Sequence, residues 1–72
     1  MKAIIEGIEI ADVAIIGKWD GLGKMVDWSC PAANVNAKEL LKIEQAGFCF
    51  RIKGDVCYVT SRQIYTEFKE ED

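Results

Sequence analysis

The sequence predicts a small α+β domain, in which one antiparallel sheet of four to five strands carries two helices packed on one face, in the order β-β-β-α-β-β-α. Three observations lead to this prediction. A capping box at residues 36–39 begins an amphipathic helix, and two segments rich in β-formers flank a Gly-Asp pair. The chain has 72 residues, which is enough for one core and little else. Residues 1–72 are therefore expected to form a single compact domain.

The first 35 residues are expected to supply three strands. In residues 2–10, isoleucines alternate approximately with glutamates, and residues 12–17 form an apolar, β-branched run that suits a buried strand. Residues 8–17 could instead be helical, because periodicity does not separate helix from strand in so short a run. The turn residues at 20–23 predict a hairpin whose returning strand is 24–28.

A helix is expected to begin after Asn36. Its side chain can accept from a free backbone amide, and Glu39 can reach back to complete a capping box. The apolar face centres on Leu40, and Gly47 ends the helix in a left-handed conformation. Residues 29–35, which contain the only proline, form the connector that precedes it.

Residues 48–53 and 56–60 predict a second hairpin. The first segment alternates with period two, and the second is rich in β-formers. A two-residue loop at Gly54-Asp55 pairs Lys53 with Val56, Ile52 with Cys57, Arg51 with Tyr58, and Phe50 with Val59. Cys49 and Cys57 then point to opposite faces and cannot form a disulfide.

Ser61 is expected to cap a last helix. Its apolar stripe, Ile64, Tyr65 and Phe68, would dock on the sheet. Residues 70–72 are all acidic and would lie at the C-terminus of this helix, where the macrodipole disfavours anions, so this end is expected to fray.

The patterns also predict a core. Its expected members are Ile5, Val13, Ile15, Val26, Leu40, Leu41, Ile43, Phe48, Phe50, Ile52, Val59, Ile64 and Phe68. A polar substitution at Phe50 or Ile64 is expected to cost several kcal/mol and largely to unfold so small a domain.

Composition argues against several classes of function. The three cysteines form no CxxC pair and the chain has no histidine, so no metal site or cofactor is expected and the commonest general base is missing. The sequence therefore predicts a protein that is not an enzyme. The longest apolar run, residues 13–16, is far shorter than the roughly 20 residues of a membrane span, which predicts no membrane association and a cytoplasmic location.

Two features near the first hairpin invite a functional interpretation. Gly21-Leu22-Gly23-Lys24 lacks the spacing of a nucleotide-binding loop, and a hairpin turn explains its glycines. Trp19 and Trp28 flank this turn. If the strands pair symmetrically about Leu22, the two are expected to be near neighbours across the hairpin, where they would either pack in the core or form an exposed aromatic patch.

The leading hypothesis is a non-catalytic protein-binding or regulatory module, of the accessory or inhibitor kind often encoded by phages and mobile elements. The net charge of −3, the two tryptophans and the missing catalytic set favour it. The partner would be a protein of unknown identity that binds an aromatic face at Trp19 and Trp28, and a homodimer through an exposed sheet edge is a further possibility.

The alternative is a small DNA-binding regulator. Residues 36–65 carry five basic residues against three acidic ones. The helix, the hairpin around Phe50-Arg51-Ile52-Lys53-Gly54 and the expected last helix resemble the wing and last helix of excisionase-like winged-helix proteins. That resemblance implies a nucleic-acid face built from Lys38, Lys42, Arg51, Lys53 and Arg62. The acidic total makes nucleic acid the less favoured partner.

Overall fold

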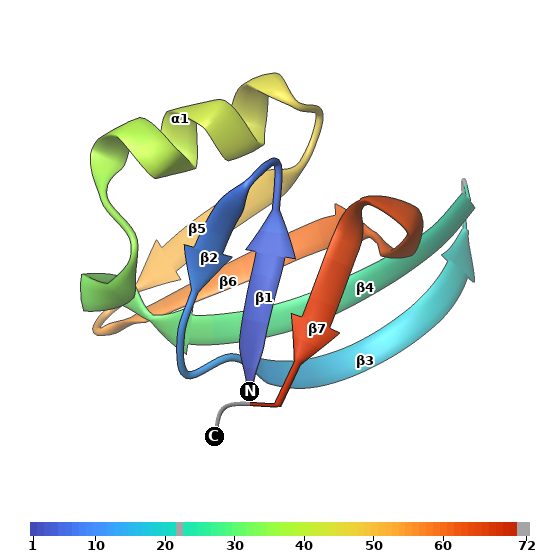
Figure 1. The fold of residues 1–72 in the computed structure, drawn as a ribbon, viewed down its shortest axis with the longest axis horizontal. Coiled ribbons are helices and arrows are strands. Elements are labelled where there is room, and N and C mark those ends of the chain that lie inside the picture. The colour runs from blue at the N-terminus through green and yellow to red at the C-terminus, as the bar shows by residue number, and fades with distance from the viewer. Residues whose placement is uncertain (22, 71–72) are drawn as a thin grey trace.

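The computed structural model describes residues 1–21 and 23–70, which form two antiparallel sheets and one α-helix (Figure 1). One sheet has the strand order β2-β1-β7 and the other β3-β4-β6-β5. The elements are β1 (Lys2–Ile5), β2 (Ile8–Ile10), β3 (Ala14–Gly21), β4 (Gly23–Pro31), the 3₁₀ turn η1 (Ala32–Asn34), α1 (Ala37–Gln45), β5 (Cys49–Lys53), β6 (Val56–Arg62), the 3₁₀ turn η2 (Gln63–Tyr65) and β7 (Thr66–Lys69). The prediction of a mixed α+β fold with antiparallel strands is confirmed, whereas the prediction of a single sheet with two helices is wrong.

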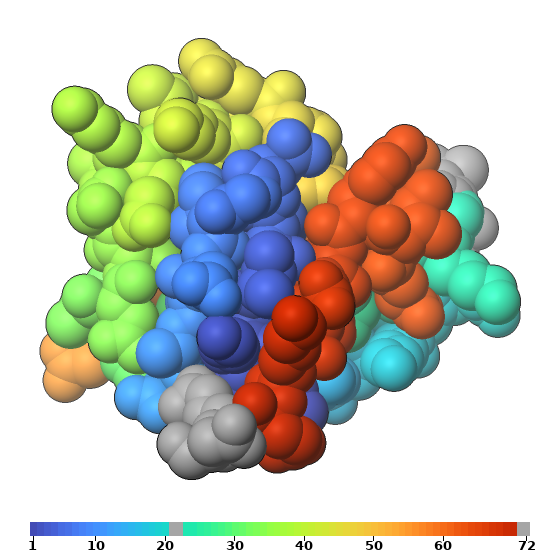
Figure 2. All heavy atoms as spheres, in the orientation of Figure 1, coloured from blue at the N-terminus to red at the C-terminus, as the bar shows by residue number. Residues whose placement is uncertain are grey.

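The two sheets lie face to face and enclose the core. In Figure 1 the strands of the three-stranded sheet cross those of the four-stranded sheet at a steep angle, and α1 covers one end of the space between them. Figure 2 shows the side of the three-stranded sheet as a closed surface, with β1 and β2 in blue between α1 and β7. Leu40 and Ile43 of α1 are buried in the same core cluster as residues from both sheets.

The N-terminal segment forms a hairpin rather than one strand. Glu6 and Gly7 both have positive φ, 51° and 78°, which is the requirement of a type I′ turn, and Ile5 pairs with Ile8 across it. The expectation of a single strand over residues 2–10 is therefore wrong. The alternative of a helix over residues 8–17 is also excluded, because β2 and β3 occupy most of that range.

The β3–β4 hairpin has the predicted position. Gly21 pairs with Gly23, and the returning strand runs on to Pro31, three residues beyond the expected 24–28. The ladder is interrupted between Ile15 and Gly17, so Ile16 occupies a bulge. Leu22, at the centre of the Gly21-Leu22-Gly23-Lys24 motif, lies outside the described residues.

The predicted features of α1 and of the β5–β6 hairpin are confirmed. The Glu39 amide donates to Asn36 Oδ1 at 2.9 Å, the Asn36 amide donates to Glu39 Oε1 at 3.1 Å, and Gly47 has a φ of 90°. All four predicted pairs of β5 with β6 occur in the expected register. Cys49 is exposed while Cys57 is buried, so the two thiols lie on opposite faces.

The expected last helix does not form, and Ser61 caps nothing. Strand β6 continues to Arg62, η2 makes a short turn, and β7 then pairs with β1 from Lys2↔Lys69 to Ile5↔Thr66. The spacing of Ile64, Tyr65 and Phe68 fits a helical stripe, but pairing with β1 satisfies the backbone of this segment instead. Glu70 follows β7 and is exposed, and residues 71–72 of the expected frayed end lie outside the described residues.

The core differs from the predicted one in two ways. Ile64 is 73% exposed because it lies in η2, and Leu41 and Ile52 are also exposed, on the solvent side of α1 and on the edge strand β5. A polar substitution at Ile64 is therefore not expected to unfold the domain, contrary to the sequence-based expectation. The buried residues outside the predicted core are Ala3, Ile8, Ile10, Trp28, Cys30 and Cys57, and the burial of Trp28 agrees with the first of the two alternatives given for the tryptophans.

Trp28 is the largest fully buried side chain. Its ring meets Phe68 of β7 edge to face, with centroids 6.2 Å apart, and its Nε1–H donates to Ser61 Oγ at 2.9 Å. Ser61 Oγ is also hydrogen bonded to Thr66 Oγ1 at 2.8 Å, and the Thr66 hydroxyl donates to the Arg62 carbonyl at 2.9 Å. One buried polar network therefore joins β4, β6 and β7 across the two sheets.

Replacing Ser61 by alanine is expected to reduce the free energy of unfolding by about 1–3 kcal/mol, because the buried Trp28 N–H loses its acceptor. Urea unfolding followed by tryptophan fluorescence measures this change. Ser29→Ala is the matched control, since Ser29 lies on the opposite face of β4, and its effect is expected to stay within about 0.5 kcal/mol. An equal reduction of the free energy of unfolding in the two variants would contradict the role assigned to Ser61.

Candidate functional site

The face of the four-stranded sheet that points away from the core is called the outer face here. Side chains alternate between the two faces of a strand, so the residues that precede and follow a buried residue point to the outer face. The bulge adds Ile16 to this face. The outer face comprises Ile16, Gly17 and Trp19 of β3, Met25, Asp27 and Ser29 of β4, Val56, Tyr58, Thr60 and Arg62 of β6, and Cys49, Arg51 and Lys53 of β5. The three-stranded sheet and α1 pack on the opposite face, so the described residues place no second layer here (Figure 1).

The strand register arranges these side chains in rows across the sheet. One row runs from Arg51 through Tyr58 to Ser29, and the next runs from Cys49 through Thr60 to Asp27. Neighbours within a row lie about 5 Å apart. The register therefore brings residues from three different strands into one patch.

Asp27 lies at the centre of the outer face and both of its carboxylate oxygens accept hydrogen bonds. Thr60 Oγ1 donates to Oδ1 at 2.6 Å, and Trp19 Nε1 donates to Oδ2 at 3.2 Å. The indole of Trp19, 46% exposed, is thereby held on the sheet with much of its ring in solvent. An exposed tryptophan fixed by a hydrogen bond loses little conformational entropy when a partner packs against it.

Three cations on this face have no counterion among the residues that the structure describes. Arg51, Lys53 and Arg62 are exposed, and no carboxylate of the described residues lies within ion-pairing distance of them. Their charge contrasts with the net charge of −3 of the whole chain. The outer face is thus a locally positive region of an acidic protein.

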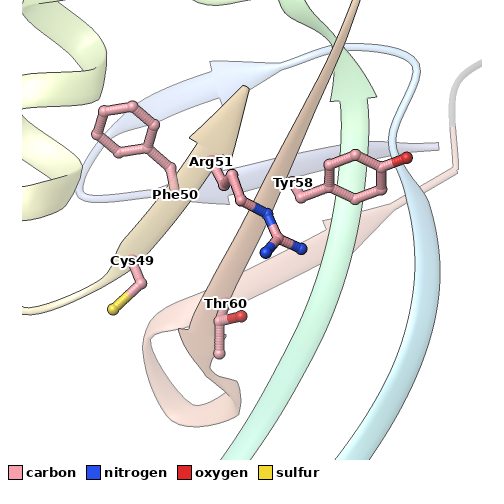
Figure 3. A pocket seen from close by; sticks show the side chains of 5 residues that line it. All are labelled: Cys49, Phe50, Arg51, Tyr58 and Thr60. Atoms are coloured by element: carbon pink, nitrogen blue, oxygen red, sulfur yellow. The ribbon is translucent and has the colours of Figure 1, made fainter. Parts of the chain in front are cut away.

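Two shallow hollows lie on the outer face and share Arg51, Tyr58 and Thr60. The larger, about 320 Å³, extends from Ile16 on β3 across Asp27 to Arg51 on β5. The smaller, about 250 Å³, continues from Arg51 to Cys49. Figure 3 shows the Arg51 guanidinium reaching over β6 and the Tyr58 ring extending over β4, whereas Phe50 points the other way, toward α1.

The predicted pairing of the two tryptophans is wrong. Trp19 pairs with Met25 and Trp28 pairs with Ile15, so the indoles lie on opposite faces of the sheet. Pairing symmetric about residue 22 places Trp19 opposite Met25, which is three positions from Trp28 along β4. Residues an odd number of positions apart on a strand point to opposite faces. Trp28 is fully buried, which leaves Trp19 as the tryptophan available to a partner.

The five cations predicted to form one face lie in two places. Arg51, Lys53 and Arg62 share the outer face. Lys38 and Lys42 lie on α1, whose Leu40 and Ile43 pack into the core on the other side of the sheet. The structure therefore joins three of the five and separates the other two.

Sequence reasoning assigned no binding role to Ile16, Asp27, Tyr58 or Thr60. Tyr58 was placed beside Arg51 by the predicted register of the second hairpin, and this was the one available signal. The contribution of β3 and β4 depends on the pairing of β4 with β6, which brings Asp27 beside Thr60 although 33 positions separate them.

The side chains of the outer face are of kinds that can make polar and apolar contacts with a ligand. A guanidinium offers five donors in a planar fork that matches a carboxylate or a phosphate, and Trp19 and Tyr58 offer aromatic surface for packing. Among residues 1–21 and 23–70, no group of three or more potential metal ligands lies together. No helix in the same part of the chain is long and apolar enough to cross a membrane.

The three cysteines have different environments. Cys30 and Cys57 are directly opposite each other on β4 and β6, on the buried side of the sheet. Burial, with a further contribution from Cys57, raises the pKa of the Cys30 thiol to about 11, and burial also raises the pKa of Cys57. Cys49 is exposed and lines the smaller hollow.

Comparison of the chain with protein-family models, with curated proteins and with solved structures finds no match.

Iodoacetamide is expected to modify Cys49 alone in the folded protein. Cys30 and Cys57 are buried and their raised pKa values keep the thiolate, the reactive form, scarce. Intact-mass spectrometry after a short reaction counts the modified thiols. Cys49→Ser should abolish labelling of the folded protein, and all three thiols of the wild type should react in urea. Labelling of Cys30 or Cys57 as fast as Cys49 would contradict their placement.

Proposed function

We propose that the protein is a non-catalytic protein-binding module whose contact surface is the outer face of the four-stranded sheet. The observation that carries the proposal is the gathering of Arg51, Tyr58 and Trp19, with two further uncompensated cations, on a sheet face that no described element covers. Tryptophan, tyrosine and arginine are the residue types that most often dominate the binding energy of protein interfaces.

The arrangement of the face supports this function. Ile16 is 59% exposed and lies in the same hollow as Arg51 and Tyr58, so apolar and charged groups adjoin. Protein interfaces combine an apolar centre with polar groups that fix orientation. The ladder holds both kinds of side chain on rigid strands, which reduces the ordering cost when a partner binds.

Self-association is a related proposal that uses the sheet edges. Strands β3 and β5 are the edges of the four-stranded sheet, and each pairs with a neighbour on one side only within the described residues. The free backbone groups of an edge can pair with a strand of a second copy. The bulge at Ile16 makes β5 the better edge for such pairing.

Site-specific photo-crosslinking tests the proposed interface. With the photoreactive residue p-benzoylphenylalanine in place of Tyr58, the protein is expected to form an adduct with a discrete protein in the cells that naturally contain it. The same residue in place of Lys42 on α1 should not form that adduct. Gel mobility followed by mass spectrometry identifies the product.

Charge reversal provides the matched control for this experiment. Arg51→Glu with Lys53→Glu is expected to reduce the adduct yield about tenfold or more, because charged groups at an interface contribute strongly to specificity. Lys38→Glu with Lys42→Glu changes the net charge equally on α1 and should leave the yield unchanged. Equal adducts from positions 58 and 42, or equal losses from both charge reversals, would overturn the proposal.

A second candidate function is nucleic-acid binding, which the grouping of Arg51, Lys53 and Arg62 favours. The resemblance to winged-helix proteins loses support, because η2 and β7 replace the last helix. Asp27 also places a carboxylate among the cations, where a passing phosphate backbone would meet it.

A salt titration against labelled single- and double-stranded DNA tests this candidate. Three cations neutralise at most three phosphates, so the slope of log K against log salt for duplex DNA is expected to be no steeper than about −3, with no binding at physiological ionic strength. Fluorescence anisotropy measures both quantities. A steeper slope, or binding that survives physiological salt and is lost in Arg51→Glu with Lys53→Glu, would make nucleic acid the partner.

A further inference from the structure

We infer that the segment recognised by the outer face is an extended stretch of a partner protein, with an acidic side chain at one position and a large apolar side chain four residues away. This inference rests on the proposed function and specifies the chemistry of its partner. It follows from the two ends of the larger hollow, the distance between them, and the carboxylate that lies between them.

The two ends of the hollow differ in chemistry. The β5 end holds Arg51, whose guanidinium makes no ion pair with any described carboxylate, and Lys53 lies two residues further along the same strand. The β3 end holds the exposed Ile16, and the indole of Trp19 is tied to Asp27 at the edge of the hollow. A ligand that fills the hollow therefore requires a negative group at one end and an apolar group at the other.

Charge complementarity identifies the negative group as a carboxylate. A single Glu or Asp side chain can take two parallel hydrogen bonds from the Arg51 fork, which is the geometry that arginine provides best. A polyanion would instead extend past Arg51 over Asp27 and past the other acidic residues of a chain whose net charge is −3. The face therefore suits a discrete carboxylate better than a phosphate backbone.

The width of the sheet sets the spacing of the two groups. From β3 to β5 there are three gaps between neighbouring strands, which together span about 14 Å. Residues i and i+4 of an extended chain lie about 13 Å apart and point to the same side. An extended segment that crosses the strands can thus set residue i over β5, with its carboxylate turned toward the Arg51 guanidinium over β6, and residue i+4 over Ile16 on β3.

Asp27 limits which residue of the segment can lie between the acidic and the apolar side chain. Residue i+2 of the segment also points toward the sheet, and it lies over the central strands, where both Asp27 oxygens already accept hydrogen bonds. An acidic residue at i+2 would be repelled by this carboxylate, whereas a serine would be tolerated. The four-residue spacing and the repulsion of an acidic residue at i+2 together define a pattern that a merely acidic peptide does not satisfy.

The test is a titration of ¹⁵N-labelled protein with synthetic peptides, followed by amide chemical shifts. The matched peptide carries glutamate and leucine four residues apart, separated by threonine-serine-threonine, within glycine-serine flanks. Three further peptides replace the glutamate by glutamine, shorten the spacing by one residue, or replace the central serine by aspartate. The matched peptide is expected to bind about tenfold more tightly than each of the three and to shift amides of β3, β4, β5 and β6.

Protein variants provide the second half of the test. Arg51→Gln is expected to reduce the affinity for the matched peptide about tenfold, and Lys42→Gln on α1 should leave that affinity unchanged. Equal affinity for all four peptides, or shifts confined to another part of the molecule, would overturn the inference. Tighter binding of a single-stranded oligonucleotide in the same titration would overturn it by assigning the face to nucleic acid. Chemical shifts that change with protein concentration alone would overturn it by assigning the face to a second copy.

The outcome separates this inference from the function on which it rests. If no peptide pattern is preferred while the crosslink from position 58 forms and is lost on charge reversal of Arg51 and Lys53, the spacing rule fails and the protein-binding function stands. If the crosslink is also absent, both fail.

Discussion

Trp28 fills the space between the two sheets, and its N–H donates to Ser61 on the neighbouring strand. Because side chains alternate along β4, an inward Trp28 also fixes Val26 and Cys30 inward and turns Asp27 outward. A slip of one residue would expose the indole and bury the Asp27 carboxylate without its partners, and both changes are costly. The composition of the outer face is thus a consequence of what the central strand buries.

The parts of the fold that could be predicted are those specified by neighbouring residues. The Asn36–Glu39 capping box, the left-handed Gly47 and the loop at Gly54 each depend on short-range backbone chemistry, and all occur as expected. The prediction of a last helix is wrong because the apolar spacing of this segment also fits a turn followed by a strand. Pairing of that strand with β1 favours the strand over the helix. The first turn was missed because Glu6 takes a positive φ, which is uncommon for a residue other than glycine.

The candidate site could be predicted only in part, for the same reason. Arg51 and Lys53 were assigned together because one hairpin carries both. The position of Trp19 relative to Trp28 required the β3–β4 register, and the role of Asp27 required the pairing of β4 with β6. Patterns within a segment indicate which face a residue occupies, but they do not indicate which other segments contribute to that face.

The acidic character of the chain and the basic outer face act over different distances. Charges separated by more than about 8 Å are largely screened at physiological ionic strength, so the net charge of −3 acts mainly on a long polyanion that extends beyond the face. A single carboxylate seated on Arg51 is close enough to be attracted by the guanidinium before the more distant acidic residues act on it. In the proposed complex, this charge distribution disfavours nucleic acid and favours a short acidic segment, so that selectivity comes from repulsion as well as attraction.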